Sequence, residues 1–150
     1  MKESPLYIDT SVLVVYTLAS RVESGRFRHV EEMFNLINRG ALPAVTSFYA
    51  LLELFMIGLD NSTGFVQGSK QGKAALMKVL ESDILLFPMV SRQDRLIHAP
   101  LFKLLKDPAD VPHAICAYIM KCGAIVTYDN HFSACAGLIE NLTPEEILSR

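Results

Sequence analysis

Short apolar runs alternate with longer amphipathic segments along the first third of the chain. The run Leu6–Ile8 ends at Asp9 and leads into residues 10–18, which are apolar after small polar residues at their start. This order predicts a buried strand that feeds directly into a helix. A second helix is expected to begin at Ser24, because the apolar residues after it follow helical spacing and Gly40 stands where a C-terminal cap belongs.

The same alternation continues to the end of the chain. Further strands are expected at residues 44–46, 84–87 and 124–127. Further helices are expected at residues 47–57, 73–82, 91–105 and 111–121, and a capping box at 143–146 predicts a last short one. Pro100 should divide the helix expected at 91–105 into two short helices or kink it. Strands that alternate with helices predict an α/β fold, a three-layer α/β/α sandwich with a central parallel sheet, in one domain over residues 1–150.

One stretch, residues 60–72, departs from this alternation. It is polar and contains three glycines. Such a composition is typical of turns and loops. We therefore expect it to be the one flexible connection in the chain.

Composition narrows the class of protein. The 150 residues, 51% of them apolar, support one core and leave no room for a second domain. No stretch reaches 18 uncharged apolar residues and the N-terminus lacks a leader pattern, so we expect no membrane association and no signal peptide. Three cysteines in mostly apolar contexts fit reduced thiols in the cytoplasm. The net charge of −2 excludes a generally basic nucleic-acid coat but not a local basic groove.

Four acidic residues stand where a charge should be unfavourable. Asp9, Glu53 and Asp129 each interrupt an apolar run, and Asp110 opens an apolar helix. An unpaired buried carboxylate costs several kcal/mol, so such a group is normally paired, protonated or bound to a metal.

The predicted fold brings these four acids together. Asp9 and Asp129 follow strands, Asp110 opens a helix that leads into a strand, and Glu53 lies about two turns into the helix after another strand. The ligand crevice of an open parallel sheet lies outside the carboxyl ends of its strands. Crowded carboxylates repel each other, and a hard divalent cation, Mg²⁺ or Mn²⁺, relieves that repulsion.

Structural roles could explain three of the acids singly. Asp9 and Asp110 are good N-cap residues, and Asp129 could belong to an ordinary turn. Glu53 has no such explanation, since a carboxylate in mid-helix neither caps nor turns. Together, the four favour a site.

Other kinds of site find less support. His113, Cys116 and Cys122 lie near one another, but their spacing is looser than that of zinc ligands, and a core histidine with core cysteines explains them better. The chain lacks a nucleophile elbow and a phosphate-binding glycine loop.

At this point the sequence resembles a known family. Residues 7–13 (YIDTSVL) resemble the opening of PIN-domain ribonucleases, and residues 46–54 (TSFYALLEL) resemble their second motif. Residues 110–117 (DVPHAICA) and 124–132 (AIVTYDNHF) resemble the third and fourth. Small members of this family are mostly VapC-type toxins of toxin–antitoxin pairs.

The resemblance implies metal-dependent endonucleolytic cleavage of RNA by a homodimer that a cognate antitoxin protein inhibits. By family likeness Asp9, Asp110 and Asp129 hold the metal, Mg²⁺ or Mn²⁺, and Glu53 completes the acidic cluster. Ser11 and Thr127 correspond to polar positions that line such sites and bind substrate.

The chain departs from the family pattern after Asp129. Some members carry a further acid there, whereas Asn130 and His131 follow in this chain. Asp107 is a second acid just before Asp110 and an alternative to it.

Three functions remain open from the sequence. The first is a metal-dependent endoribonuclease, either a toxin or an RNA-processing enzyme without an antitoxin. The second is a PIN-like module that binds RNA or protein without cutting, and the third is a small phosphohydrolase. An RNA backbone needs cationic contacts. Candidates for them are Arg21, Arg26, Arg28, Lys70, Lys73, Arg92 and Arg95.

Overall fold

The computed structural model describes residues 3–150. Met1 and Lys2 lie outside the described residues, and so does this start of the N-terminal segment in which no leader is expected. Its centre is a five-stranded sheet in the order β3-β2-β1-β4-β5, and every neighbouring pair is parallel. The strands are β1 (Leu6–Ile8), β2 (Ala44–Ser47), β3 (Leu85–Phe87), β4 (Ala124–Val126) and β5 (Glu140–Leu142). This confirms the predicted parallel sheet.

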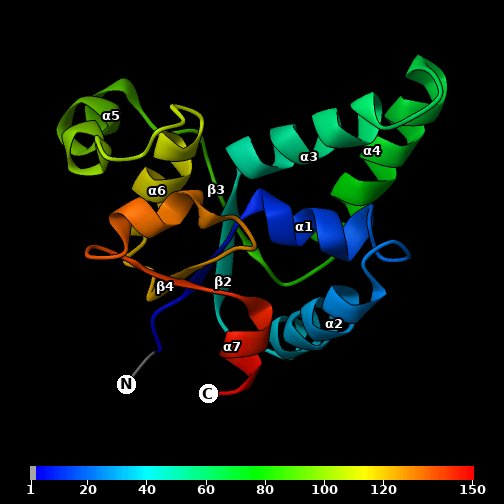
Figure 1. Ribbon diagram of the computed structural model, residues 1–150, viewed down its shortest axis with the longest axis horizontal. Helices are drawn as coiled ribbons and strands as arrows, with labels where there is room; N and C mark the ends of the chain where they lie inside the picture. Colours follow the sequence, from blue (N-terminus) through cyan, green and yellow to red (C-terminus); the bar gives the residue numbers. More distant parts are fainter. Residues whose placement is uncertain (1–2) are drawn as a thin grey trace.

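Helices cover both faces of the sheet, as expected for a three-layer sandwich (Figure 1). One face carries α1 (Thr10–Thr17), α2 (Ser24–Asn38), α3 (Phe48–Asp60), α4 (Phe65–Leu80) and α7 (Pro144–Leu148). The other carries α5 (Arg92–His98), α6 (Asp110–Ile119) and the 3₁₀ helices η1 (Ala99–Phe102) and η2 (Asn130–Cys135). In residues 3–150, no helix is both long enough and apolar enough to cross a lipid bilayer.

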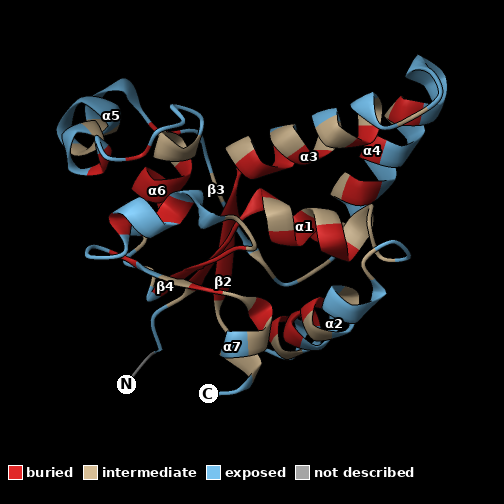
Figure 2. Ribbon diagram, viewed as in Figure 1, coloured by how far each residue is buried: buried red, intermediate tan, exposed pale blue. Residues whose placement is uncertain are grey.

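Alternation along β1 divides the core between the two faces. Leu6 and Ile8 pack into the cluster under α1 and α2, whereas Tyr7 between them packs into the cluster under α6. Successive side chains of a strand point to opposite faces, and all three are buried because helices cover both sides (Figure 2).

The predicted flexible connection at residues 60–72 is wrong for most of its length. The link between α3 and α4 spans residues 61–64, residue 60 ends α3, and residues 65–72 belong to α4, which lies along α3 (Figure 1). A Cβ atom built on Gly58 would lie 2.9 Å from the Gly72 Cα atom, and one on Gly68 would lie 2.8 Å from the Leu59 carbonyl oxygen. The glycines of α4 therefore permit close packing of two helices rather than a mobile loop.

Other differences are smaller. The helix expected around Pro100 is two short helices, α5 and η1, with Pro100 in the first turn of η1. The Thr143–Glu146 capping box forms as predicted. The edge strand β5 was not predicted, because it has three residues and two of them are polar.

Candidate active site

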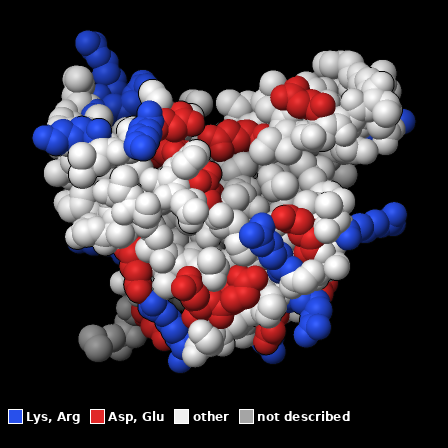
Figure 3. Space-filling model, viewed as in Figure 1, with Lys and Arg blue, Asp and Glu red and all other residues white. Residues whose placement is uncertain are grey.

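The four predicted acids all lie at the carboxyl end of the sheet. Asp9 directly follows β1, and Asp129 comes three residues after β4. Asp110 is the first residue of α6, and Glu53 is in the second turn of α3, the helix after β2. Figure 3 shows acidic side chains gathered in the hollow between α3 and the α5–α6 side of the molecule.

Asp9 is buried and held by hydroxyl groups. Its Oδ2 atom accepts hydrogen bonds from the hydroxyls of Ser11, at 2.8 Å, and Thr127, at 2.9 Å. The backbone N–H of Ser11 also donates to Oδ2, so Asp9 caps α1 as well. Within the described residues these bonds all end on Oδ2, which leaves Oδ1 for a ligand.

Ser11 and Thr127 also fix the segment that carries Asp129. Ser11 Oγ accepts the backbone N–H of Tyr128 at 3.0 Å, and Thr127 Oγ1 accepts that of Asp129 at 2.9 Å. Each hydroxyl thus joins Asp9 to the loop after β4. The two residues predicted to line the site do lie there, and their hydroxyl protons are directed to Asp9.

Asp110 is mostly buried and incompletely satisfied. The N-cap of α6 is Ala109, so the alternative that Asp110 caps its helix is wrong. Its Oδ2 atom is buried and has no hydrogen-bond partner in the described part of the chain. Burial and the nearby charge of Asp107 raise the pKa of Asp110, further charges on Asp129 and Asp9 add to this, and His131 offsets only part.

His131 is a member of the site that the sequence did not identify. Its Nδ1 atom lies 3.3 Å from Asp110 Oδ2 and 3.3 Å from Asp129 Oδ2. One ligand atom each from Asp107, Asp110 and His131 lies within 4.8 Å of the other two. The sequence offered Asp107 as an alternative to Asp110, but in the structure the two carboxylates lie side by side. The departure from the family pattern after Asp129 was the signal that could have drawn attention to His131.

Glu53 lies at the edge of this cluster and has its own partners. His113 Nε2 is 2.8 Å from its Oε1 atom, and the Thr10 hydroxyl donates to Oε2 at 2.6 Å. Burial acts to raise the pKa of Glu53, but the hydrogen bonds from His113 and Thr10 and the charge of His113 outweigh it and hold that pKa below its usual value. Glu53 is therefore ionised at neutral pH.

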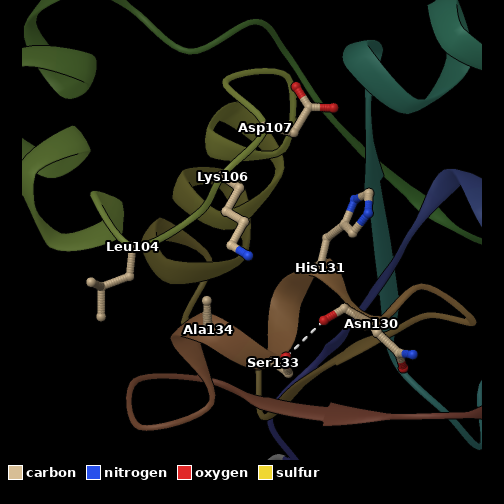
Figure 4. Close-up of a pocket in the computed structure, with 7 residues that line it drawn as sticks. All are labelled: Leu104, Lys106, Asp107, Asn130, His131, Ser133 and Ala134. Atoms are coloured by element: carbon tan, nitrogen blue, oxygen red, sulfur yellow. Dashed lines mark hydrogen bonds between the residues drawn. The ribbon is translucent and has the colours of Figure 1, made fainter.

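A pocket of about 240 Å³ opens beside His131 (Figure 4). Its lining combines basic, acidic, polar and apolar side chains: Leu104, Lys106, Asp107, Asn130, His131, Ser133 and Ala134. Further basic residues lie on the same side of the molecule, where Figure 3 shows Lys and Arg over α5 next to the acidic hollow. Arg92 and Arg95 of α5 and Lys103 after η1 are all exposed.

The residues weighed for a zinc site have other roles. Both ring nitrogens of His113 are in hydrogen-bonding contact, with Tyr7 and Glu53. Cys116 and Cys122 are free thiols, and burial raises the pKa of each to about 12. Both thiols are therefore protonated at neutral pH.

The arrangement fits a divalent cation. Three other carboxylates, those of Asp107, Asp129 and Asp9, act on Asp110, and its buried Oδ2 atom accepts no hydrogen bond from the described residues. Oxygen donors of this kind suit hard divalent ions. The family model of the PIN domain matches residues 5–131. The chain belongs to the PIN-domain family. This is a family of nucleases, as the resemblance of the four sequence motifs implied.

Solved structures with the same fold include two from the VapC group. VapC20 of Mycobacterium tuberculosis, a sarcin–ricin loop cleaving toxin, superposes on this PIN domain with a TM-score of 0.65 at 15% identity, covering 90% of this chain and 97% of VapC20. VapBC2 from Rickettsia felis, bound to a DNA fragment from its promoter, gives a TM-score of 0.66 at 16% identity, covering 91% of this chain and 97% of the other. No curated protein sequence matches the chain significantly.

Proposed function

We propose that this PIN domain is an endoribonuclease that requires Mg²⁺ or Mn²⁺ and is the toxin of a toxin–antitoxin pair. The observation that carries the proposal is the buried Oδ2 atom of Asp110, which lies among the charges of three other carboxylates, Asp9, Asp107 and Asp129. Within residues 3–150 this atom accepts no hydrogen bond, and its contact with His131 Nδ1 is 3.3 Å long. Membership of a nuclease family and the fold shared with VapC toxins support the choice of reaction.

Asp9, Asp110 and Asp129 would hold the cation, and Glu53 completes the acidic cluster. A bound cation would offset charge on the attacked phosphate and lower the pKa of a water molecule. Glu53, ionised at neutral pH, can orient that water or accept its proton. Ser11 and Thr127 act through Asp9, because their hydroxyls hold Oδ2 and leave Oδ1 available to a cation.

Cleavage assays on RNA with matched aspartate variants test this function. Asp9→Asn and Asp110→Asn should each abolish cleavage of labelled ribosomal and transfer RNA in Mn²⁺, with unchanged circular dichroism. Asp83→Asn is the control. Asp83 is exposed and precedes β3, so it lies at the amino end of the parallel strands, whereas the site lies at their carboxyl end. Excess EDTA should stop the wild-type enzyme, and added Mn²⁺ should restore it.

Several outcomes would contradict the proposal. Unchanged cleavage by both site variants, or full activity in excess EDTA, would exclude the metal mechanism. RNA binding without any cleavage in Mn²⁺ would favour a binding module. Turnover of bis(p-nitrophenyl) phosphate without RNA cleavage would favour a small phosphohydrolase.

The proposed partners are a second copy of the chain and an antitoxin protein, in the cytoplasm where the three free thiols stay reduced. Large apolar side chains are exposed on α3 (Leu52, 55%) and α5 (Leu96, 68%; Ile97, 57%), and such surfaces favour association. Sedimentation at micromolar concentration should give twice the chain mass of 16.7 kDa. A monomer under those conditions would exclude the homodimer.

A further inference from the structure

A chain of buried polar side chains runs from the core to Glu53. His113 is 1% exposed, and its Nδ1 and Nε2 atoms lie 2.7 Å from Tyr7 Oη and 2.8 Å from Glu53 Oε1. Tyr7 Oη is in turn 2.7 Å from Ser47 Oγ. Strands β1 and β2 and helix α6 therefore all contribute to one connection that ends on a carboxylate of the site.

The direction of the last bond in this chain is determined. A carboxylate oxygen accepts hydrogen bonds, so His113 Nε2, 2.8 Å from Glu53 Oε1, carries the hydrogen and donates it. Burial raises the pKa of Tyr7 well above its usual value, so its hydroxyl keeps its proton. That hydroxyl can donate to Nδ1 or accept from it, and it therefore supports the imidazole in either protonation state.

The imidazole ring has little freedom to turn. Tyr7 and Phe132 place their rings edge-to-face against it, at centroid distances of 6.0 and 6.4 Å, and Tyr49 lies tilted at 6.2 Å. Rotation about the side-chain bonds would also separate both nitrogens from their partners. His113 is thus a fixed donor at the base of the site.

Glu53 is held from a second direction by α1. The Thr10 hydroxyl donates to Oε2, while His113 donates to Oε1, so each carboxylate oxygen has its own anchor. The Glu53 side chain is 40% exposed, and without these bonds it would sample several rotamers at the protein surface. A histidine with only a packing role in the core would not need a hydrogen bond to Glu53, a partly exposed carboxylate of the candidate site.

We propose that His113 and Thr10 are positioning residues that hold the Glu53 carboxylate in one orientation toward the metal site, with Tyr7 fixing the imidazole. The inference rests on the proposed function, since it assigns the task of Glu53 to that site. Groups that orient the ligands of a metal site typically change metal affinity or activity by about 10- to 100-fold when they are removed.

Two matched pairs of variants test the positioning role. Thr10→Val should lower kcat for RNA about 10-fold or more with KM little changed, whereas Thr10→Ser, which keeps the hydroxyl, should stay close to wild type. Tyr7→Phe should lower kcat, whereas Tyr49→Phe should not. Both tyrosines pack against His113, but the Tyr49 hydroxyl accepts the N–H of Val90 and lies outside the chain of bonds.

A double-mutant cycle separates positioning from stability. In a Glu53→Gln background, Thr10→Val and Tyr7→Phe should cause no further loss of kcat, although their effects on urea unfolding should persist. His113→Leu should behave as Tyr7→Phe does, with a lower kcat in the wild-type background and no further loss of kcat in the Glu53→Gln background. Equal losses in the presence and absence of the Glu53 carboxylate, or equal kcat for Tyr7→Phe and Tyr49→Phe, would overturn the inference.

Mn²⁺ binding by calorimetry keeps this test independent of RNA cleavage. Thr10→Val should weaken Mn²⁺ binding and Thr10→Ser should not. Failure of the wild-type protein to cut RNA would count against the proposed function alone, because the Mn²⁺ affinities of the same variants still decide the positioning role. Unchanged affinity in Thr10→Val and Tyr7→Phe, with unchanged kcat, would exclude it.

Discussion

His131 brings a nitrogen atom to a site whose other candidate ligands are carboxylates. Oxygen donors suit Mg²⁺, whereas an imidazole nitrogen favours transition-metal ions. Of the two ions considered, an imidazole ligand therefore favours Mn²⁺ over Mg²⁺. His131→Asp should therefore lower the ratio of the Mg²⁺ to the Mn²⁺ dissociation constant by about tenfold, measured by calorimetry. His98→Asp is the control for adding an acid elsewhere. An unchanged ratio in His131→Asp would show that His131 only balances charge.

At the scale of single residues, the sequence predicted the acidic candidates of the site but not the residues that hydrogen-bond to Glu53. The sequence could single out four candidate acids because a carboxylate inside an apolar run is costly: Asp9, Glu53, Asp110 and Asp129. His113 and Thr10 could not, because a first-turn histidine and a helix-start threonine have ordinary structural roles that no single sequence separates from a contact with Glu53. Their role depends on α3, α1 and α6 meeting at one edge of the sheet.

The α3–α4 pair shows how an element-scale prediction failed. Glycine and polar residues usually indicate a loop, but here Gly68 and Gly72 face α3 at distances that exclude a Cβ atom. Periodicity alone does not distinguish a glycine that permits motion from one that permits close packing. Strands β1, β2 and β4 were predictable as short continuous apolar runs, which the structure buries on both faces of the sheet. The other helices were predictable because their apolar residues recur with a period near 3.6.

Two glycine-to-alanine substitutions should have opposite effects on stability. A Cβ atom on Gly58 would meet the backbone of Gly72 at 2.9 Å, which cannot yield cheaply, so Gly58→Ala should destabilise the protein by about 1–3 kcal/mol. Gly25→Ala in α2 has open space around it and should stabilise by up to about 1 kcal/mol. Urea unfolding measures both. Equal and small effects would mean that α3 and α4 are not tightly packed.

Over the whole molecule, the net charge of −2 hides a separation of charge. Apart from Asp9, Glu53, Asp110 and Asp129, the chain has 14 basic and 12 acidic residues. The exterior is therefore slightly basic around an acidic hollow. Figure 3 shows the basic side chains over α5 beside that hollow, so an RNA backbone bound at the proposed metal site would pass close to them.

The salt dependence of RNA binding should reveal which basic face the RNA uses. Binding of a labelled single-stranded RNA to the Asp9→Asn variant should weaken steeply with salt, since each phosphate contact adds about 0.7 to the slope of log K against log salt. Replacing Arg92 and Arg95 of α5 with glutamine should reduce that slope by about 1.4 if each contacts a phosphate. The same charge change at Lys70 and Lys73, both exposed on α4, should leave the slope unchanged. An equal reduction by the two pairs would indicate a general charge effect, and a reduction by the α4 pair alone would place the RNA across α4.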